Sequence, residues 1–193
     1  MLKIKWLIVA FSSLRLFPHL LFFFVFKNRC YADVKVGMEH QKCGGPVWAG
    51  FLFLMTFEKT YRNIFYYRIG YYKFFISFLA PAHNSFIIGT HAEIGEGFLA
   101  IHPIGTIIDA KIGRNFIVKQ NATVGRNGND NPIVGDNVTV NANALVIGNI
   151  TVGNNVEVGA GTILMKSVPD NCVVVGNPAY ILKENGVRVN RKL

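Results

Sequence analysis

The chain has 193 residues, which is enough for one substantial domain with an appended region. Lys and Arg number 20 against 11 Asp and Glu, and the resulting net charge of +9 favours anionic partners. The basic residues form no run of the kind that binds nucleic acid. The three cysteines have no zinc-binding spacing and are odd in number, so a disulfide framework is disfavoured and a cytoplasmic location is expected.

The first apolar segment, residues 6–26, is nearly long enough to span a membrane, but Arg15 lies near its middle, and Pro18 and His19 interrupt it. Three interpretations remain open, in order of preference: an amphipathic helix in the membrane interface, a helix packed on the protein, and a secretory signal. The interruption and a second apolar segment downstream disfavour the signal.

A polar, glycine-containing stretch at residues 28–46 is predicted to be a linker. Residues 47–79 are again rich in aromatic residues, and their apolar positions predict one or two helices that break near Gly70 and end before Pro81. Basic residues are interleaved with the aromatic ones, which suits both packing on the protein and contact with lipid headgroups. Region 1–82 is therefore predicted to be helical and apolar, with membrane-surface contact and no nucleic-acid binding.

A six-residue repeat dominates the rest of the chain. Aliphatic or small residues recur at every sixth position, and the phase slips by four residues once before it resumes. This period fits neither a helix nor a strand and is typical of a parallel β-helix. A Val- and Gly-rich β-sandwich is the disfavoured alternative. The repeat positions are Ile88, Ile94, Ala100, Thr106, Ile112, Val118, Val124, Val134, Val140, Val146, Val152, Val158 and Leu164.

Four stretches, at 94–105, 118–128, 140–171 and 174–182, resemble the hexapeptide-repeat acyltransferases, and most closely their serine acetyltransferase-like branch. The resemblance implies a mainly β fold, with a left-handed parallel β-helix over residues 83–182. It also implies assembly as a homotrimer and acetyl-CoA as the acyl donor.

Two N-terminal segments, SLRLFPHLLFF and YRNIFYYRIG, look like those of capsule and O-antigen acetyltransferases in the same branch. That resemblance implies a saccharide acceptor.

His102 matches the catalytic histidine of the branch. An alcohol is a poor nucleophile until a general base takes its proton, and imidazole titrates near the working pH. The resemblance therefore implies that His102 is the base, whereas a histidine before proline can also simply fill a corner of the solenoid.

The sequence departs from serine acetyltransferases at three positions. Ile101 and Ile87 stand where the family has aspartates that grip serine and orient the histidine, and Asn131 replaces a second histidine. These losses favour a neutral sugar hydroxyl as acceptor. They also leave the orienting partner of His102 open among Asp109, His91 and Asp130.

The phase slip falls at residues 125–132, which are rich in Gly, Asn and Asp and must leave the coil as a loop. The resemblance implies that this loop lines a cleft between subunits, and a tolerated surface insertion is the equally weighted alternative. The predicted acceptor contacts are Ile101, Arg126, Asn127 and Asn131.

The acetyl-CoA site is inferred from the same resemblance, at small residues that let the slender pantetheine chain approach the backbone. The predicted contacts are Gly125, Ala142, Ala144, Gly159, Ala160, Gly161, Gly176, Pro178 and Lys183. The basic C-terminal tail, residues 183–193, either meets the nucleotide phosphates or is a solvated terminus. The histidines have no metal-ligand spacing, so no metal is expected.

The sequence thus predicts an acetyl-CoA-dependent O-acetyltransferase that modifies a surface polysaccharide such as capsule or O-antigen, or its precursor. The expected location is cytoplasmic, at the inner face of a bacterial membrane. Serine O-acetyltransferase of cysteine biosynthesis and a non-catalytic solenoid scaffold are the alternatives.

Overall fold

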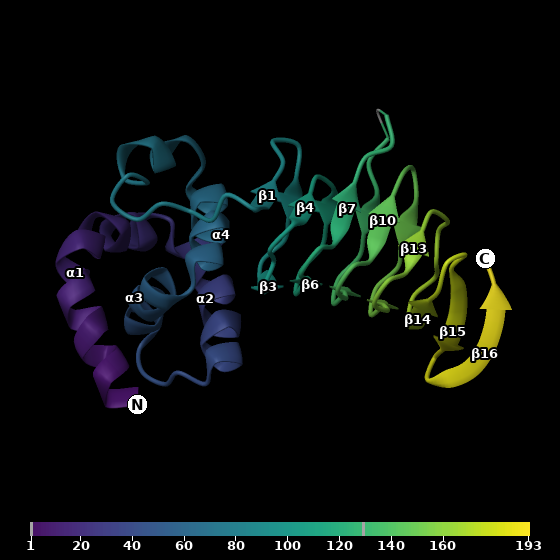
Figure 1. Cartoon of the computed structure of the whole chain (residues 1–193), viewed down its shortest axis with the longest axis horizontal. Coiled ribbons are helices and arrows are strands. Elements are labelled where there is room, and N and C mark those ends of the chain that lie inside the picture. Colours follow the sequence, from purple (N-terminus) through teal and green to yellow (C-terminus); the bar gives the residue numbers. More distant parts are fainter. Residues whose placement is uncertain (1, 129) are drawn as a thin grey trace. The chain divides into compact units, whose positions relative to one another are not determined.

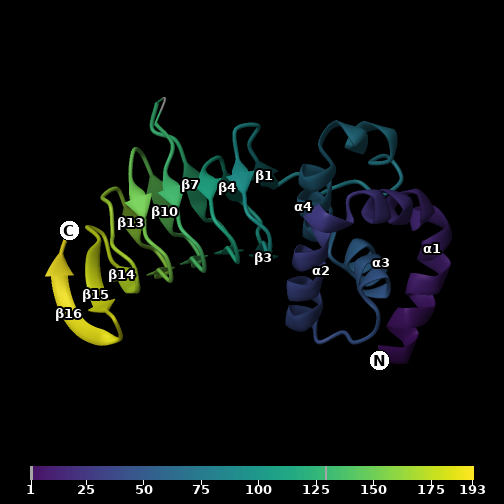
Figure 2. The same ribbon diagram turned by 180° about the vertical axis from the view of Figure 1, so that it is seen from behind.

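The computed structural model describes residues 2–128 and 130–193, and the chain divides into two compact units, Met1–Asn84 and Ser85–Leu193. Figures 1 and 2 show helices in the first unit and stacked coils of short strands in the second. The predicted fold class, mainly β with a parallel β-helix and an α-helical N-terminal region, is confirmed.

The helical unit is built around an apolar central helix. Its elements are α1 (Leu2–Val25), α2 (Lys27–Gln41), α3 (Val47–Phe57), α4 (Lys59–Ile69) and the 3-10 helix η1 (Gly70–Phe75). The sequence of α3 is apolar on nearly every side, so this helix can be buried from all directions, and it lies between α1 and α2 (Figure 2). Phe51 of α3 stacks on Phe23 with ring centroids 4.7 Å apart and meets Phe65 edge-on at 4.9 Å.

The prediction of a linker over residues 28–46 is wrong, because most of this stretch forms α2. The buried residues Cys30, Val34, Gly37 and Met38 recur every three to four positions and form one helix face. A Cβ at Gly37 would lie 2.8 Å from the Leu54 side chain, so the glycine allows α2 and α3 to pack closely.

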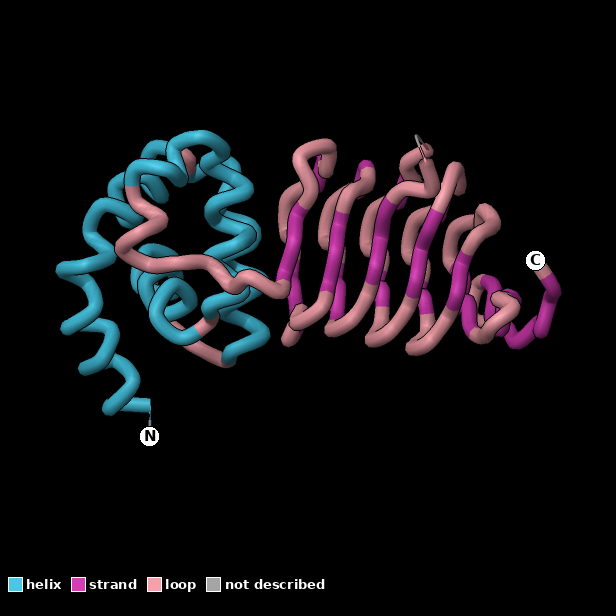
Figure 3. The backbone as a smooth tube through the Cα atoms, turned by 45° about the horizontal axis from the view of Figure 1, so that its top comes forward, coloured by secondary structure: helices cyan, strands magenta, loops and turns pink. Residues whose placement is uncertain are grey.

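The solenoid unit has three parallel faces, which Figure 3 shows as stacked coils. Face A contains β1 (Phe86–Ile88), β4 (Thr106–Ile108), β7 (Thr123–Gly125), β10 (Leu145–Ile147) and β13 (Ile163–Leu164). Face B contains β2 (Glu93–Ile94), β5 (Lys111–Ile112), β8 (Ile133–Val134) and β11 (Thr151–Val152). Face C contains β3 (Leu99–Ile101), β6 (Ile117–Lys119), β9 (Thr139–Val140), β12 (Glu157–Val158) and β14 (Cys172–Val175), followed by β15 (Tyr180–Glu184) and β16 (Val187–Lys192).

The repeat positions fill the solenoid interior. All of them are buried except Ile88 and Ala100, which are half-buried. Most pair in register with their counterparts one coil away, as Val118 does with Val140. Thr106 and Ile88 pair instead with Phe86 and Ile108, which lie two residues from the repeat position. A parallel coil puts equivalent residues above one another, so the six-residue period becomes a continuous apolar column.

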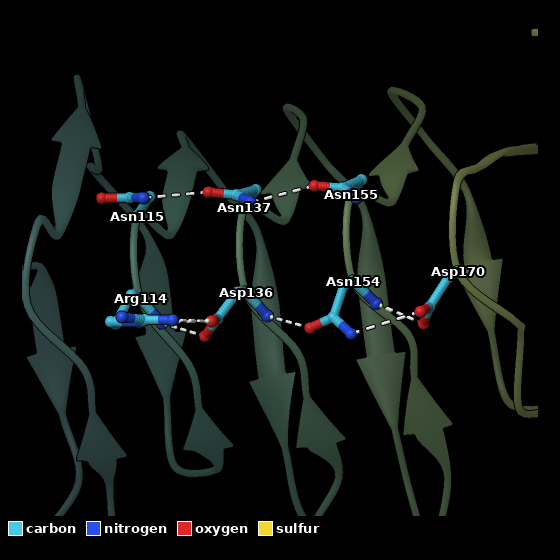
Figure 4. A network of polar contacts seen from close by, with 7 residues as sticks. All are labelled: Arg114, Asn115, Asp136, Asn137, Asn154, Asn155 and Asp170. Carbon is cyan, nitrogen blue, oxygen red and sulfur yellow. Dashed lines mark hydrogen bonds and ion pairs between the residues drawn. The ribbon is translucent and has the colours of Figure 1, made fainter.

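A polar ladder holds the edge between faces B and C (Figure 4). Asn115, Asn137, Asn155 and Asn171 have left-handed φ values of 55° to 57°, which asparagine tolerates better than most residues. Each side chain donates to the next at 2.9 Å. A second row connects Arg114 to Asp136 by an ion pair and Asn154 to Asp170 by hydrogen bonds.

The C-terminal residues, predicted to be a tail, form an antiparallel hairpin instead. Strand β15 pairs antiparallel with β14 and thus extends face C, and β16 pairs with β15. Arg191 and Glu184 form an ion pair at 2.9 Å across the hairpin. The alternation of Val and basic residues in VRVNRK is a strand pattern that the high charge of this segment obscured.

Candidate active site

His102 lies on an edge of the solenoid, directly after β3 and at the start of the turn into β4. Its φ is 48°, a left-handed conformation that is uncommon for a residue other than glycine. The carbonyl of His102 accepts a hydrogen bond from the N–H of Ile104 at 2.7 Å, which tightens the turn. His102 is exposed and Pro103 is buried, so the histidine does not belong to the packed interior.

The turns from face C to face A stack above one another and form one edge of the solenoid. We call it the His102 edge; it comprises residues 102–105, 120–122, 141–144 and 159–162. The turn at 176–179, which joins β14 to β15 within face C, continues this edge, because the Ile163 N–H donates to the Gly176 carbonyl at 3.2 Å. Backbone hydrogen bonds join successive turns, with Asn121 donating to Ile104 at 2.9 Å and Gly161 donating to Ala142 at 2.9 Å. The edge is therefore a continuous ridge with His102 near one end.

Most of the predicted acetyl-CoA contacts lie on the His102 edge. They are Ala142, Gly159, Ala160, Gly161, Gly176 and Pro178. Gly161 has a φ of +69°, and a Cβ added there would meet no atom within 4 Å. At Gly161 the edge thus leaves open space beside the backbone, as a slender ligand would require.

Three predicted contacts are not presented on the surface of this edge. Ala144, although in a turn of the His102 edge, is fully buried in the solenoid interior. Gly125 ends β7 at the opposite end of the face A strands, and Lys183 is exposed on β15. The solenoid therefore does not gather these three residues with the others.

The predicted acceptor residues Arg126, Asn127 and Asn131 follow β7 in the loop where the repeat slips. This loop belongs to a second edge, between faces A and B, which we call the loop edge; it comprises residues 89–92, 109–110, 126–132, 148–150 and 165–167. Asn127 and Asp130 exchange backbone hydrogen bonds at 3.2 and 3.4 Å. Asn129 lies outside the described residues. The fourth predicted residue, Ile101, is half-buried on β3 directly before His102.

The proposed orienting partners of His102 lie on the loop edge too. Asp109 accepts from the N–H of His91 at 3.2 Å and forms an ion pair with Arg126 at 3.0 Å. Asp130 is in the loop itself. Because the His102 edge and the loop edge are different edges of the prism, one chain does not bring these groups to His102.

Sequence reasoning missed an apolar surface on face A. The outward positions of its strands include Ile87, Ile107, Leu145 and Ile163, and Ile87 is 50% exposed. The signal was available, because positions next to the inward repeat residues are expected to be polar on a solvated face. Among residues 2–128 and 130–193, no group of three or more His, Cys, Asp or Glu residues could hold a metal ion.

Comparisons with known proteins agree with this architecture. Residues 131–166 match the family model described as bacterial transferase hexapeptide (six repeats). A serine acetyltransferase of Staphylococcus aureus is 39% identical over 106 residues, which cover 52% of this chain and 50% of the relative. The serine acetyltransferase of Synechococcus elongatus is 32% identical over 105 residues, covering 51% of this chain and 43% of the relative. The chain thus spans about half the length of the curated relatives that it matches.

Among solved structures, the serine acetyltransferase of Neisseria gonorrhoeae superposes with a TM-score of 0.65 at 25% identity, covering 87% of this chain and 66% of the other. The same enzyme in complex with serine gives a TM-score of 0.68 at 24% identity, covering 86% and 72%. The solenoid thus resembles the hexapeptide-repeat transferases in fold, and residues 131–166 resemble them in sequence.

The predicted polysaccharide acceptor is contradicted by these relatives, which are serine acetyltransferases and not capsule or O-antigen enzymes. The prediction rested on the likeness of two N-terminal segments to capsule and O-antigen acetyltransferases, and the absence of two carboxylates was read as further support for a sugar. Ile101 and Ile87 remove two contacts, but a missing contact does not create affinity for another acceptor.

Proposed function

We propose that this protein is a serine O-acetyltransferase, which transfers the acetyl group of acetyl-CoA to the serine hydroxyl with His102 as general base. The proposal is carried by the 39% identity over 106 residues to a serine acetyltransferase. The exposed position of His102 on a continuous edge of small residues supports it. The free, buried cysteines suit a reducing cytoplasm.

In the chemical step, His102 takes the hydroxyl proton while the serine oxygen attacks the carbonyl carbon of the thioester. The tetrahedral intermediate then collapses, the carbon–sulfur bond breaks, and the imidazolium returns the proton to the coenzyme A thiolate. A positioned general base of this kind contributes about 10² to 10⁴ in rate.

The acyl donor would lie along the His102 edge. Pantetheine carries two amides, which can bond to the backbone groups that this edge exposes between coils. Ala142, Ala160 and Gly161 leave room for its approach, and the turn at Gly176 would bound the far end of the groove. The exposed Lys183 offers a charge for the nucleotide phosphates.

The acceptor would be held by the loop edge of a neighbouring copy. Arg126 can bind the carboxylate of serine, and Asp130 can bind its ammonium group in place of the missing aspartates. Asn127 and Asn131 would line the same wall. Because these residues and His102 lie on different edges, a complete site requires two subunits, with the apolar face A as a candidate contact in a homotrimer.

The test is to incubate the full chain with acetyl-CoA and measure thiol release with serine, with threonine and with no acceptor, while mass spectrometry identifies the product. We expect serine-dependent thiol release with O-acetylserine as product. Thiol release that serine does not raise above the background hydrolysis rate would contradict the proposal.

Subunit mixing tests the shared site. His102→Ala and Arg126→Ala proteins should each be nearly inactive alone, and refolding them together should restore about a quarter of the wild-type rate, because random mixing pairs an intact His102 with an intact Arg126 at that frequency. A mixture as inactive as its components would mean that each site lies within one subunit.

A further inference from the structure

The helical unit exposes a large apolar surface that the proposed transfer reaction does not use. On α1 the exposed residues recur every three to four positions along one face, and on the other side Leu16, His19 and Phe23 are buried against the bundle. Phe11 and Leu14 are 87% and 86% exposed. The face consists of Ile4, Leu7, Ile8, Phe11, Leu14, Phe17, Leu21, Phe24 and Val25.

A second group of exposed aromatic side chains continues this surface. Tyr71 is 86% exposed, and Phe74, Phe75 and Phe78 are also exposed. Tyr72 joins the two groups, because its ring lies 5.8 Å from Phe22 and 5.3 Å from Phe26 near the end of α1. Contiguous apolar surface of this extent marks an interaction site on a soluble protein.

The charges around the surface have one sign. Residues 1–32 contain five Lys or Arg and no Asp or Glu. Residues 59–84 contain no acid, and of their four basic residues Lys59 and Lys73 are exposed, whereas Arg62 is buried and Arg68 is paired with Asp33. Arg15 is exposed within the α1 face, Lys73 lies 5.5 Å from the Phe74 ring, and Lys27 follows the end of α1. Cations beside exposed aromatic rings suit an anionic lipid surface, where the rings enter the interface and the long basic chains reach the headgroups.

We infer that the apolar face of α1 and the aromatic residues of η1 dock the protein on an anionic lipid bilayer, with α1 lying in the interface. A second copy of the chain fits this face less well, because close packing would bury Arg15 where interface cores are depleted of charge. Among the described residues, α1 is the one helix long and apolar enough to cross a membrane by length and composition. Spanning would nonetheless require α1 to leave α3 and carry Arg15 into the hydrocarbon.

The test is co-sedimentation of the full chain with vesicles of phosphatidylcholine alone and of phosphatidylcholine with phosphatidylglycerol. We expect binding to the mixed vesicles, weakened by salt, and at least tenfold weaker binding for Phe11→Ser/Leu14→Ser and for Phe74→Ser/Phe75→Ser. These side chains are exposed, so their loss should leave the circular dichroism spectrum unchanged. Met165→Gln, an exposed apolar residue of the solenoid, is the matched control and should bind like the parent.

Four results would overturn the inference. The parent could fail to bind mixed vesicles, or the double variants could bind as well as the parent. The double variants could have a lower mass than the parent in lipid-free ultracentrifugation, which would make the face a subunit contact. Bound protein could resist release by high salt and alkaline carbonate, which would indicate a spanning helix. None of these measurements depends on acetyl transfer.

Discussion

The two units of this protein stabilise their interiors in different ways. The described part of the solenoid buries only uncharged polar residues, Thr106, Asn141 and Thr162, and repeats one apolar position from coil to coil. The helical unit buries His19, Asp33 and Arg62, and each has a specific partner: Tyr66 for His19 Nε2, Arg68 for Asp33, and the Met55 carbonyl for Arg62. A repeat distributes stability over many similar contacts, whereas a bundle with buried polar groups depends on a few contacts that nothing else can replace.

The largest expected effect is on the buried ion pair of the helical unit. Asp33 and Arg68 approach to 2.7 Å, with side chains 1% and 9% exposed. Asp33→Ala would leave the guanidinium buried without that carboxylate, at a cost of about 4 kcal/mol. Hydrogen exchange should show faster opening of residues 2–84 while the solenoid keeps its protection. Unchanged hydrogen exchange in the helical unit would contradict the claim that its stability depends on a few single contacts.

A cavity in the solenoid should cost somewhat less and act locally. Leu164 is fully buried in β13, at the last position of the repeat. Leu164→Ala should destabilise the solenoid by about 3 kcal/mol through lost burial and an unfilled cavity. Denaturant unfolding followed by hydrogen exchange should locate the loss in coils near β13. Equal loss of protection in every coil would indicate that the solenoid unfolds as one unit.

The helical unit should weaken in acid because of His19. The Tyr66 hydroxyl donates to the Ala80 carbonyl at 2.6 Å, so it accepts a hydrogen bond from His19 Nε2 at 2.8 Å. Burial, together with Arg62 and Arg15, lowers the pKa of His19 from 6.5 to about 4. The unfolded chain therefore binds a proton that the folded chain does not.

The stability that depends on neutral His19 should be complete above pH 6.5. Between pH 6.5 and 4 it should fall by between about 2 and 3 kcal/mol. His19→Gln should abolish that slope in urea titrations of the helical unit. A slope that persists in the variant would assign the pH dependence to other groups.

The smallest expected effect is on the asparagine ladder. Asn137→Ala removes two hydrogen bonds at 2.9 Å and puts alanine at a φ of 57°, which should cost about 1 kcal/mol in total because neighbouring rungs remain. Asn137→Gly is the matched variant, because it loses the same bonds but tolerates the dihedral angle. If the two variants unfold at the same denaturant concentration, the hydrogen bonds and not the backbone angle set the cost.

The same contrast explains how much could be predicted from the sequence. From Ile88 to Leu164 every coil requires a buried apolar or small residue at the same place. The period of these residues therefore predicts the fold and most of the buried positions. Helix α2 was missed because Asp33 interrupts the apolar face formed by Cys30, Val34 and Met38, and only the distant Arg68 makes its burial tolerable. The composition of residues 28–46 does not indicate that Asp33 has an ion-pair partner 35 positions away.

The candidate site was predicted in part for a similar reason. His102 and the small residues from Ala142 to Gly161 share an edge because they share a phase of the repeat. Arg126 and Asn131 follow a different strand, so their relation to His102 depends on assembly and not on the coil. The acceptor was wrongly predicted because its recognition depends on the contacts that assembly creates, and the repeat does not indicate them.

The most direct measurement of the central claim is the steady-state rate of thiol release by His102→Ala with serine and acetyl-CoA. The predicted result is a fall in kcat of at least about 100-fold with the KM for acetyl-CoA little changed, because a general base acts in the transition state. His40→Ala, which removes an exposed histidine from α2, is the control and should keep the wild-type rate. A folded His102→Ala protein that turns over serine as fast as the wild type would contradict the account.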